Sequence, residues 1–219
     1  MQTVPDTQLN QFEGWTLRIR ETDYPDANLL LLIHGLSGDE NSMWVFARDL
    51  PLQYWIVAPR APYTADPSGY SWRPSQFGNL DGPSLEWLQE SAEGLISLVD
   101  AYSASVGIDA RVFNVMGFSQ GAGMCNVLAF LYPQRIRKVG ILAGFVPSGL
   151  EELVSQRPLE GKLFFVAHGT KDATVTVERA RTSITLLEQA GASVTYCEDD
   201  VAHKVSANCL RALKKFLTD

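Results

Sequence analysis

The sequence has few of the two side chains that most often bind metals or cross-link a chain, histidine and cysteine. Its histidines are His34, His168 and His203, and its cysteines are Cys125, Cys197 and Cys209. The cysteines are odd in number and none belongs to a CxxC pair, which argues against a disulfide framework and against a thiolate zinc site. We therefore expect free thiols and a reducing, cytoplasmic location.

Long hydrophobic runs and clusters of positive charge are also missing. The longest aliphatic run, Leu29 to Ile33, is far shorter than the roughly 20 residues that span a bilayer. It predicts a buried strand and no transmembrane segment. The first ten residues are polar and lack the basic start and apolar stretch of a secretory signal. The formal net charge of -7 repels polyanions, so we expect no nucleic-acid partner. The sequence carries no prediction of an oligomeric state.

The composition is that of a folded globular protein. The chain has 219 residues, of which 46% are hydrophobic and 20% are charged. This length is enough for a sizeable core, and no linker or repeat divides it. We expect a single domain over residues 1–219.

Short apolar runs alternate with longer segments of helical period, a pattern typical of an α/β protein with a mostly parallel central sheet and helices on both faces. The expected strands are Trp15 to Arg20, Leu29 to Ile33, Trp55 to Ala58, Val112 to Gly117, Lys138 to Ala143, Leu163 to Ala167 and Val194 to Cys197. The expected helices are Ser84 to Val106, Gln120 to Leu131, Val177 to Ala190 and Ser206 to Leu217. Pro59 to Pro83 is predicted to be a long irregular loop, and loops of that length are often functional.

One expected strand is followed by a pattern that carries chemistry. Gly117-Phe118-Ser119-Gln120-Gly121 joins an apolar run to a helical segment, which is the context of a nucleophile elbow in the α/β-hydrolase fold. In this sharp turn the glycines let strand and helix approach each other, and the serine Oγ projects above the sheet. The pattern predicts Ser119 as a nucleophile.

Serine needs a base to take its proton and an acid to orient that base. In this fold the histidine follows the last strand and the acid follows the strand before it. His203 and Asp172 occupy those positions, with Asp199 or Asp200 left open as the acid. His168, just before Asp172, is expected to be a buried, hydrogen-bonded residue, and Cys125 a packed thiol.

The loop Ile33-His34-Gly35-Leu36 has a different task. It follows a buried strand at the position where the fold supplies a backbone amide to the substrate carbonyl. The oxyanion hole is then expected from the backbone N–H groups of Leu36 and Gln120, with the His34 imidazole structural.

These motifs together resemble the phospholipase/carboxylesterase family, which includes acyl-protein thioesterases. The similarity rests on residues 117–121 preceded by Gly107-Ile108-Asp109-Ala110-Arg111. It extends through Leu32 to Leu36, Ala58 to Pro62, Tyr70 to Trp72, Ala167 to Gly169 with Asp172, and Val201 to His203. The resemblance implies hydrolysis of carboxylic esters or thioesters with no metal or organic cofactor. The chain departs from the family pattern at Ser37-Gly38-Asp39, Thr170 and Thr174, which leaves every catalytic group in place.

The substrate is expected to be a small-molecule or lipid-like acyl ester. Candidates for an acyl-binding wall, against the alternative of ordinary core packing, are Trp44, Tyr70, Trp72, Phe77 and Leu80. An acyl-protein thioesterase, a lysophospholipase or a serine peptidase would use the same triad. A hydrolase-fold protein that binds without chemistry is the remaining alternative.

Overall fold

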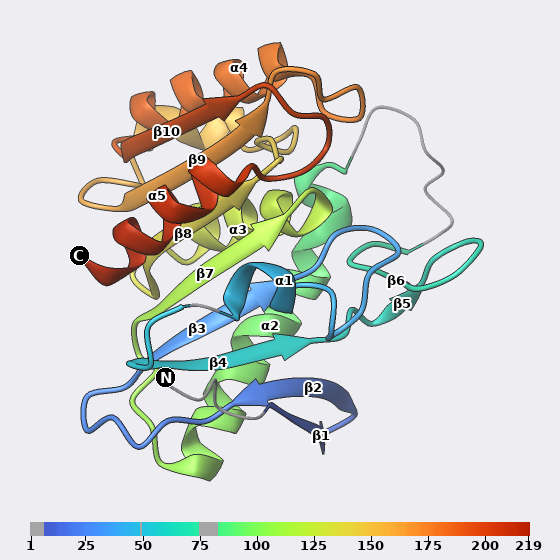
Figure 1. The fold of residues 1–219 in the computed structure, drawn as a ribbon, viewed down its shortest axis with the longest axis vertical. Coiled ribbons are helices and arrows are strands. Elements are labelled where there is room, and N and C mark those ends of the chain that lie inside the picture. The colour runs from blue at the N-terminus through green and yellow to red at the C-terminus, as the bar shows by residue number, and fades with distance from the viewer. Residues whose placement is uncertain (1–6, 49, 75–82) are drawn as a thin grey trace.

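A central sheet of eight strands runs through the computed structural model, which describes residues 7–48, 50–74 and 83–219 (Figure 1). Its strands are β1 (Gln8–Phe12), β2 (Trp15–Arg20), β3 (Asn28–Ile33), β4 (Tyr54–Pro59), β7 (Phe113–Phe118), β8 (Ile136–Leu142), β9 (Leu163–Gly169) and β10 (Ser193–Asp199). Their order across the sheet is β1-β2-β4-β3-β7-β8-β9-β10. β2 is antiparallel to both β1 and β4, and every pairing from β4 to β10 is parallel.

Helices cover both faces of this sheet. They are α1 (Trp44–Ala47), α2 (Leu85–Val106), α3 (Gln120–Leu131), the 3₁₀ helix η2 (Glu151–Gln156), α4 (Val177–Gln189) and α5 (Ala207–Thr218). In Figure 1, α1 and α5 lie in front of the sheet and α2 and α3 lie behind it. The predicted fold class, a mostly parallel sheet between two layers of helices, is confirmed. None of the helices in the described part of the chain is both long and apolar enough to cross a bilayer.

The apolar run of β3 explains how the two layers are held. Successive side chains of a strand point to opposite faces. Leu29, Leu31 and Ile33 are buried in the core with α2 and α3, whereas Leu30 and Leu32 are buried in the core with α1 and α5. A strand covered on both faces therefore has an uninterrupted hydrophobic sequence.

The seven predicted strands and four predicted helices are all present, with boundaries within two residues. Elements that were not predicted are β1, α1, η2 and a hairpin of β5 (Tyr63–Thr64) and β6 (Tyr70–Ser71). The hairpin lies inside Pro59 to Pro83, so the expectation of an irregular loop was wrong for that part. β1 is exposed along most of its length, which leaves no apolar alternation to mark it.

The expectation of free cysteines was also wrong for two of the three. Cys197 in β10 and Cys209 in α5 form a disulfide, with their Cα atoms 5.6 Å apart. They are only 12 positions apart in the sequence, and α5 packs back against β10, so the thiols meet without any CxxC spacing. Cys125 is free and buried in α3, and burial raises the pKa of its thiol well above the ordinary value.

Candidate active site

Ser119 lies in the turn between β7 and α3. Its backbone has φ 53° and ψ -114°, a conformation that a non-glycine residue rarely adopts. The Ser119 N–H donates to the Leu142 carbonyl at 2.9 Å, which anchors the turn to β8. A β-carbon at Gly117 would clash with the Gly121 carbonyl, and one at Gly121 would clash with the Ile33 carbonyl. The two glycines thus permit the close packing that holds the strained serine in place.

Three side chains from three loops meet at the carboxyl ends of the parallel strands. His203 Nε2 lies 3.0 Å from Ser119 Oγ, and His203 Nδ1 lies 2.7 Å from Asp172 Oδ2. Ser119 follows β7, Asp172 follows β9, and His203 follows β10. The structure thus brings together the three residues that the sequence analysis selected.

The Asp172 carboxylate has a fixed orientation. Its side chain is fully buried, and its Oδ1 accepts hydrogen bonds from the backbone N–H groups of Thr174 and Val175, both at 2.9 Å. Its Oδ2 faces His203, so Nδ1 of that ring carries the proton and Nε2 can accept one. A carboxylate held in this way selects the imidazole tautomer that a base requires.

The other carboxylates near this loop have different partners. Asp200 forms an exposed ion pair with Lys171 at 2.8 Å, and this hydrogen bond lowers the pKa of the Asp200 carboxyl. The Asp199 carboxylate accepts from the Asp200 N–H at 2.9 Å, and the Asp199 backbone carbonyl accepts from the Thr170 N–H at 2.9 Å. The ion pair and the Thr170 hydrogen bond fasten the loop of Asp172 to the loop of His203.

The loop after β3 lies against Ser119. A β-carbon added at Gly35 would be only 3.4 Å from the Ser119 β-carbon. Leu36, the next residue, is 49% exposed. Gln120 begins α3, so its N–H is one of the helix's first donors and has no intrahelical acceptor. Both backbone amides that were predicted for an oxyanion hole thus belong to turns adjoining Ser119.

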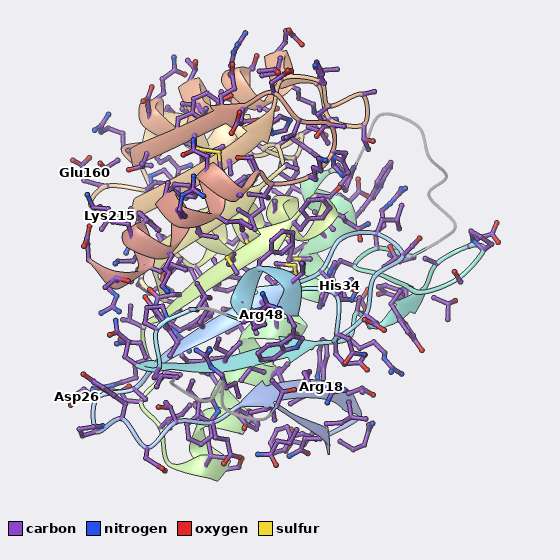
Figure 2. The ribbon with its side chains drawn as sticks, in the orientation of Figure 1. Arg18, Asp26, His34, Arg48, Glu160 and Lys215 are labelled. Atoms are coloured by element: carbon purple, nitrogen blue, oxygen red, sulfur yellow. A yellow bond between two sulfur atoms is a disulfide. The ribbon has the colours of Figure 1, made fainter. Side chains whose placement is uncertain are left out.

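His34 has the structural role that was expected. The Ala61 N–H donates to its Nε2 at 3.0 Å, so Nδ1 carries the proton and donates to the Gly35 carbonyl at 2.7 Å. Burial lowers the pKa of His34, which favours the neutral ring. Figure 2 shows His34 toward the carboxyl ends of the strands, whereas Asp26 lies beyond their amino ends.

His168 is buried and hydrogen-bonded. Its Nε2 donates to the Val175 carbonyl at 2.8 Å and lies 3.5 Å from Asp172 Oδ2, which places the His168 ring beside the Asp172 carboxylate. Within the three described ranges, no group of three or more His, Cys, Asp or Glu side chains is placed to hold a metal ion.

The residues predicted for an acyl-binding wall differ in their burial. Trp72 is 0% exposed and its indole N–H donates to the His34 carbonyl at 2.8 Å, so it presents no surface to a ligand and its assignment to the wall was wrong. Tyr70 and Trp44 are partly buried, with the Trp44 indole donating to the Glu40 carbonyl. Phe77 and Leu80 lie outside the described residues.

Two aromatic residues near His203 were not predicted to belong to the site. Phe118 precedes Ser119, and its ring centroid is 4.9 Å from that of His203. Phe46 of α1 stacks on Phe118 with centroids 5.6 Å apart. The place of Phe118 directly before Ser119 in the sequence could have pointed to it. Its contact with Phe46 could not be foreseen, because that contact depends on how α1 packs.

Sequence comparison identifies relatives over nearly the whole chain. The family model described as Phospholipase/Carboxylesterase matches residues 16–219. Acyl-protein thioesterase 1 of Debaryomyces hansenii is 27% identical over 93% of this chain and 95% of its own length. A probable carboxylesterase SOBER1-like protein of Arabidopsis thaliana is 23% identical over 92% of this chain and 82% of its own.

Solved structures share the fold. The carboxylesterase from Mesorhizobium loti superposes with a TM-score of 0.82 at 19% identity, covering 97% of this chain and 98% of that one. The Bacillus cereus carboxylesterase superposes with a TM-score of 0.82 at 21% identity, covering 94% of each chain. From the family match over residues 16–219, the chain belongs to the phospholipase/carboxylesterase family.

Proposed function

We propose that this chain hydrolyses carboxylic esters or thioesters, with Ser119 as nucleophile, His203 as general base and Asp172 as the acid that orients it. The observation that carries the proposal is the continuous contact from Asp172 through His203 to Ser119, at 2.7 and 3.0 Å. Such a contact activates a hydroxyl that is otherwise a weak nucleophile at neutral pH.

The reaction proceeds through an acyl-enzyme. Ser119 Oγ attacks the acyl carbon while His203 Nε2 takes its proton, and the carbonyl oxygen becomes an oxyanion held by the Leu36 and Gln120 N–H groups. Collapse of this intermediate breaks the bond to the leaving alcohol or thiol, which receives the proton from His203. Water then attacks the acyl-enzyme by the same route, which releases the acid and restores Ser119.

The relatives' names support this reaction class. Two are named as probable carboxylesterases and one as an acyl-protein thioesterase. A carboxylesterase releases an alcohol, whereas a thioesterase releases a thiol. Both leaving groups use the same nucleophile and the same oxyanion contacts. A paired set of oxygen and thiol esters with one acyl chain therefore separates the two activities.

The decisive experiment compares Ser119→Ala with the wild type in ester hydrolysis and fluorophosphonate labelling. We expect kcat/KM to fall by about 10³-fold or more, with labelling abolished. Ser97→Ala, on the exposed face of α2, is a matched control and should behave as wild type. Labelling that survives in Ser119→Ala would overturn the assignment. Folded wild-type protein that binds acyl esters without turnover would instead indicate a binding protein.

The sequence predicted a cytoplasmic location, and one observation of the structure argues against it. Disulfides are rare in reducing compartments, and Cys197 and Cys209 form one here. Alkylation of free thiols in cells lysed directly into denaturant, followed by mass spectrometry, decides the point, because denaturation exposes the buried Cys209. Unmodified Cys197 and Cys209 would place the protein in an oxidising compartment.

A further inference from the structure

The three residues Tyr70 to Trp72 connect the two loops that flank Ser119. The Ser37 N–H donates to the Tyr70 carbonyl at 2.9 Å, and the Tyr70 N–H donates to the Gly38 carbonyl at 3.0 Å. The Trp72 indole donates to the His34 carbonyl at 2.8 Å. The segment therefore contacts the loop after β3 on both sides of Leu36, whose N–H is one proposed oxyanion donor.

The same segment is joined to the second proposed donor through the Gln120 side chain. Gln120 Oε1 accepts from the Trp72 N–H at 3.0 Å, and Nε2 donates to Ser71 Oγ at 3.2 Å. The Trp72 N–H can only donate a hydrogen bond, so the oxygen end of the Gln120 amide must face it. Gln120 is 5% exposed, so water cannot replace these contacts readily.

A further connection holds Tyr70 from the other side. The Arg60 guanidinium lies 4.6 Å from the Tyr70 ring centroid and donates to its hydroxyl at 3.1 Å. Arg60 also forms a two-point ion pair with the buried Glu40, at 2.8 and 3.0 Å, and its hydrogen bonds lower the pKa of Glu40. Glu40 belongs to the continuation of the loop after β3, so the chain of contacts returns to that loop.

From these contacts we propose that the Gln120 side chain is a positioning residue, which acts with Tyr70–Trp72 as a strut that sets the separation of the Leu36 and Gln120 N–H groups. The inference rests on the proposed function and goes beyond it, because it assigns a role to a side chain whose backbone alone is used in the chemistry. Oxyanion stabilisation depends on donors held in place before the charge develops. Loss of the strut should weaken transition-state binding more than substrate binding.

Gln120→Met tests this role because methionine fills a similar volume without either hydrogen bond. We expect kcat per active site to fall by roughly 10- to 100-fold, with KM changed by less than about threefold. Affinity for a boronic acid, which forms a tetrahedral adduct with the serine, should fall in parallel with kcat/KM. Fluorophosphonate titration of active sites corrects for any unfolded fraction. Gln89→Met, on the exposed surface of α2, is the matched control and should retain wild-type kinetics.

Trp72→Phe provides a second, independent test, because it removes the indole donor to His34 and keeps most of the packing. It should lower kcat in the same sense by a smaller factor. The double variant should lose less than the product of the two single effects, because both act through one strut. If Gln120→Met does not fold, Ser71→Ala takes its place, because it removes the acceptor of the Gln120 Nε2 and leaves Gln120 itself unchanged. Wild-type kinetics per titrated site in that variant would overturn the proposal.

The proposal would be overturned if the folded variants kept the wild-type kcat per titrated site and the wild-type affinity for the boronic acid. A fall only in the fraction of titratable sites would also overturn it, since it would show a purely structural role. Failure of the proposed function is distinguishable, because it would appear as full activity in Ser119→Ala.

Discussion

The carboxylates near His203 differ in their contacts, and this difference predicts different effects of the same substitution. Asp172 is buried and contacts Nδ1 of His203, whereas Asp200 is exposed and pairs with Lys171. Asp172→Asn should lower kcat/KM by a large factor, on the order of 10³- to 10⁴-fold, because an amide can stabilise the wrong imidazole tautomer. Asp200→Asn is the matched control and should change kcat/KM by less than about tenfold, since it loosens a loop only. Steady-state kinetics on both variants measures this, and a reversed order would assign the acid to Asp200.

The two stacked rings beside His203 predict that a substitution of Phe46 changes the selectivity for acyl chain length. Phe46 stacks on Phe118, which in turn contacts His203. Phe46→Ala should lower kcat/KM more for long acyl chains than for acetate, because each methylene that loses apolar contact forfeits at most about 0.8 kcal/mol. A series of p-nitrophenyl esters from acetate to palmitate measures the profile.

Leu163→Ala is the control for this substitution, because it removes an exposed apolar side chain at the amino end of β9. Its acyl-length profile should match that of the wild type. An unchanged profile in Phe46→Ala as well would place the acyl chain elsewhere.

At the scale of elements, the disulfide closes the segment that carries His203. Cys197 lies in β10 and Cys209 in the first turn of α5, so the cross-link spans the loop between them. A cross-link restricts the unfolded chain, and Cys197→Ala should therefore lower the free energy of unfolding by roughly 2–3 kcal/mol. The kcat/KM should fall as well, because the imidazole is held less firmly.

Denaturation in urea, with and without a reductant, measures the effect of this cross-link. The reductant should destabilise the wild type and leave Cys197→Ala unchanged, which separates the disulfide from other actions of the reductant. Equal stability of the oxidised and reduced wild type would contradict the prediction.

At the scale of the whole molecule, His34 contributes to the pH dependence of folding. Burial lowers its pKa in the folded state, so the unfolded chain takes up a proton that the folded protein does not. Stability therefore falls as pH drops below about 6.5, the ordinary value, by up to about 1.4 kcal/mol per pH unit for one proton. The loss continues until the pH reaches the lowered pKa of the folded state.

His34→Gln tests this contribution because glutamine can accept from the Ala61 N–H but cannot take up a proton. The free energy of unfolding should vary less between pH 6.5 and 5 than in the wild type. The acid loss at lower pH should remain, because hydrogen bonds with Arg60 and Arg181 lower the pKa values of Glu40 and Glu198. An unchanged slope above pH 5 would show that other groups carry it.

Much of the fold and the site could be predicted because the information is local. The unbroken leucines of β3 require a strand buried on both faces, and the glycines around Ser119 mark a tight strand-to-helix turn. The positions of Asp172 and His203 follow from strand order. β1 escaped prediction because an exposed edge strand has no apolar alternation. Trp72 was assigned to the acyl-binding wall although it lies in the core, because a tryptophan side chain can line a pocket or pack in a core equally well.

The sequence by itself determined seven of the strands and four of the helices to within two residues, since periodicity and turn chemistry act between near neighbours in the chain. It also singled out Ser119, Asp172 and His203 as candidates, the last two from the order of the strands. Only the tertiary structure decided the Cys197–Cys209 cross-link, the burial of Trp72 and the contacts of the Gln120 side chain. These depend on which surfaces of distant segments meet when the layers pack. No local sequence pattern shows which distant segments come into contact, so these three features could be seen only in the assembled structure.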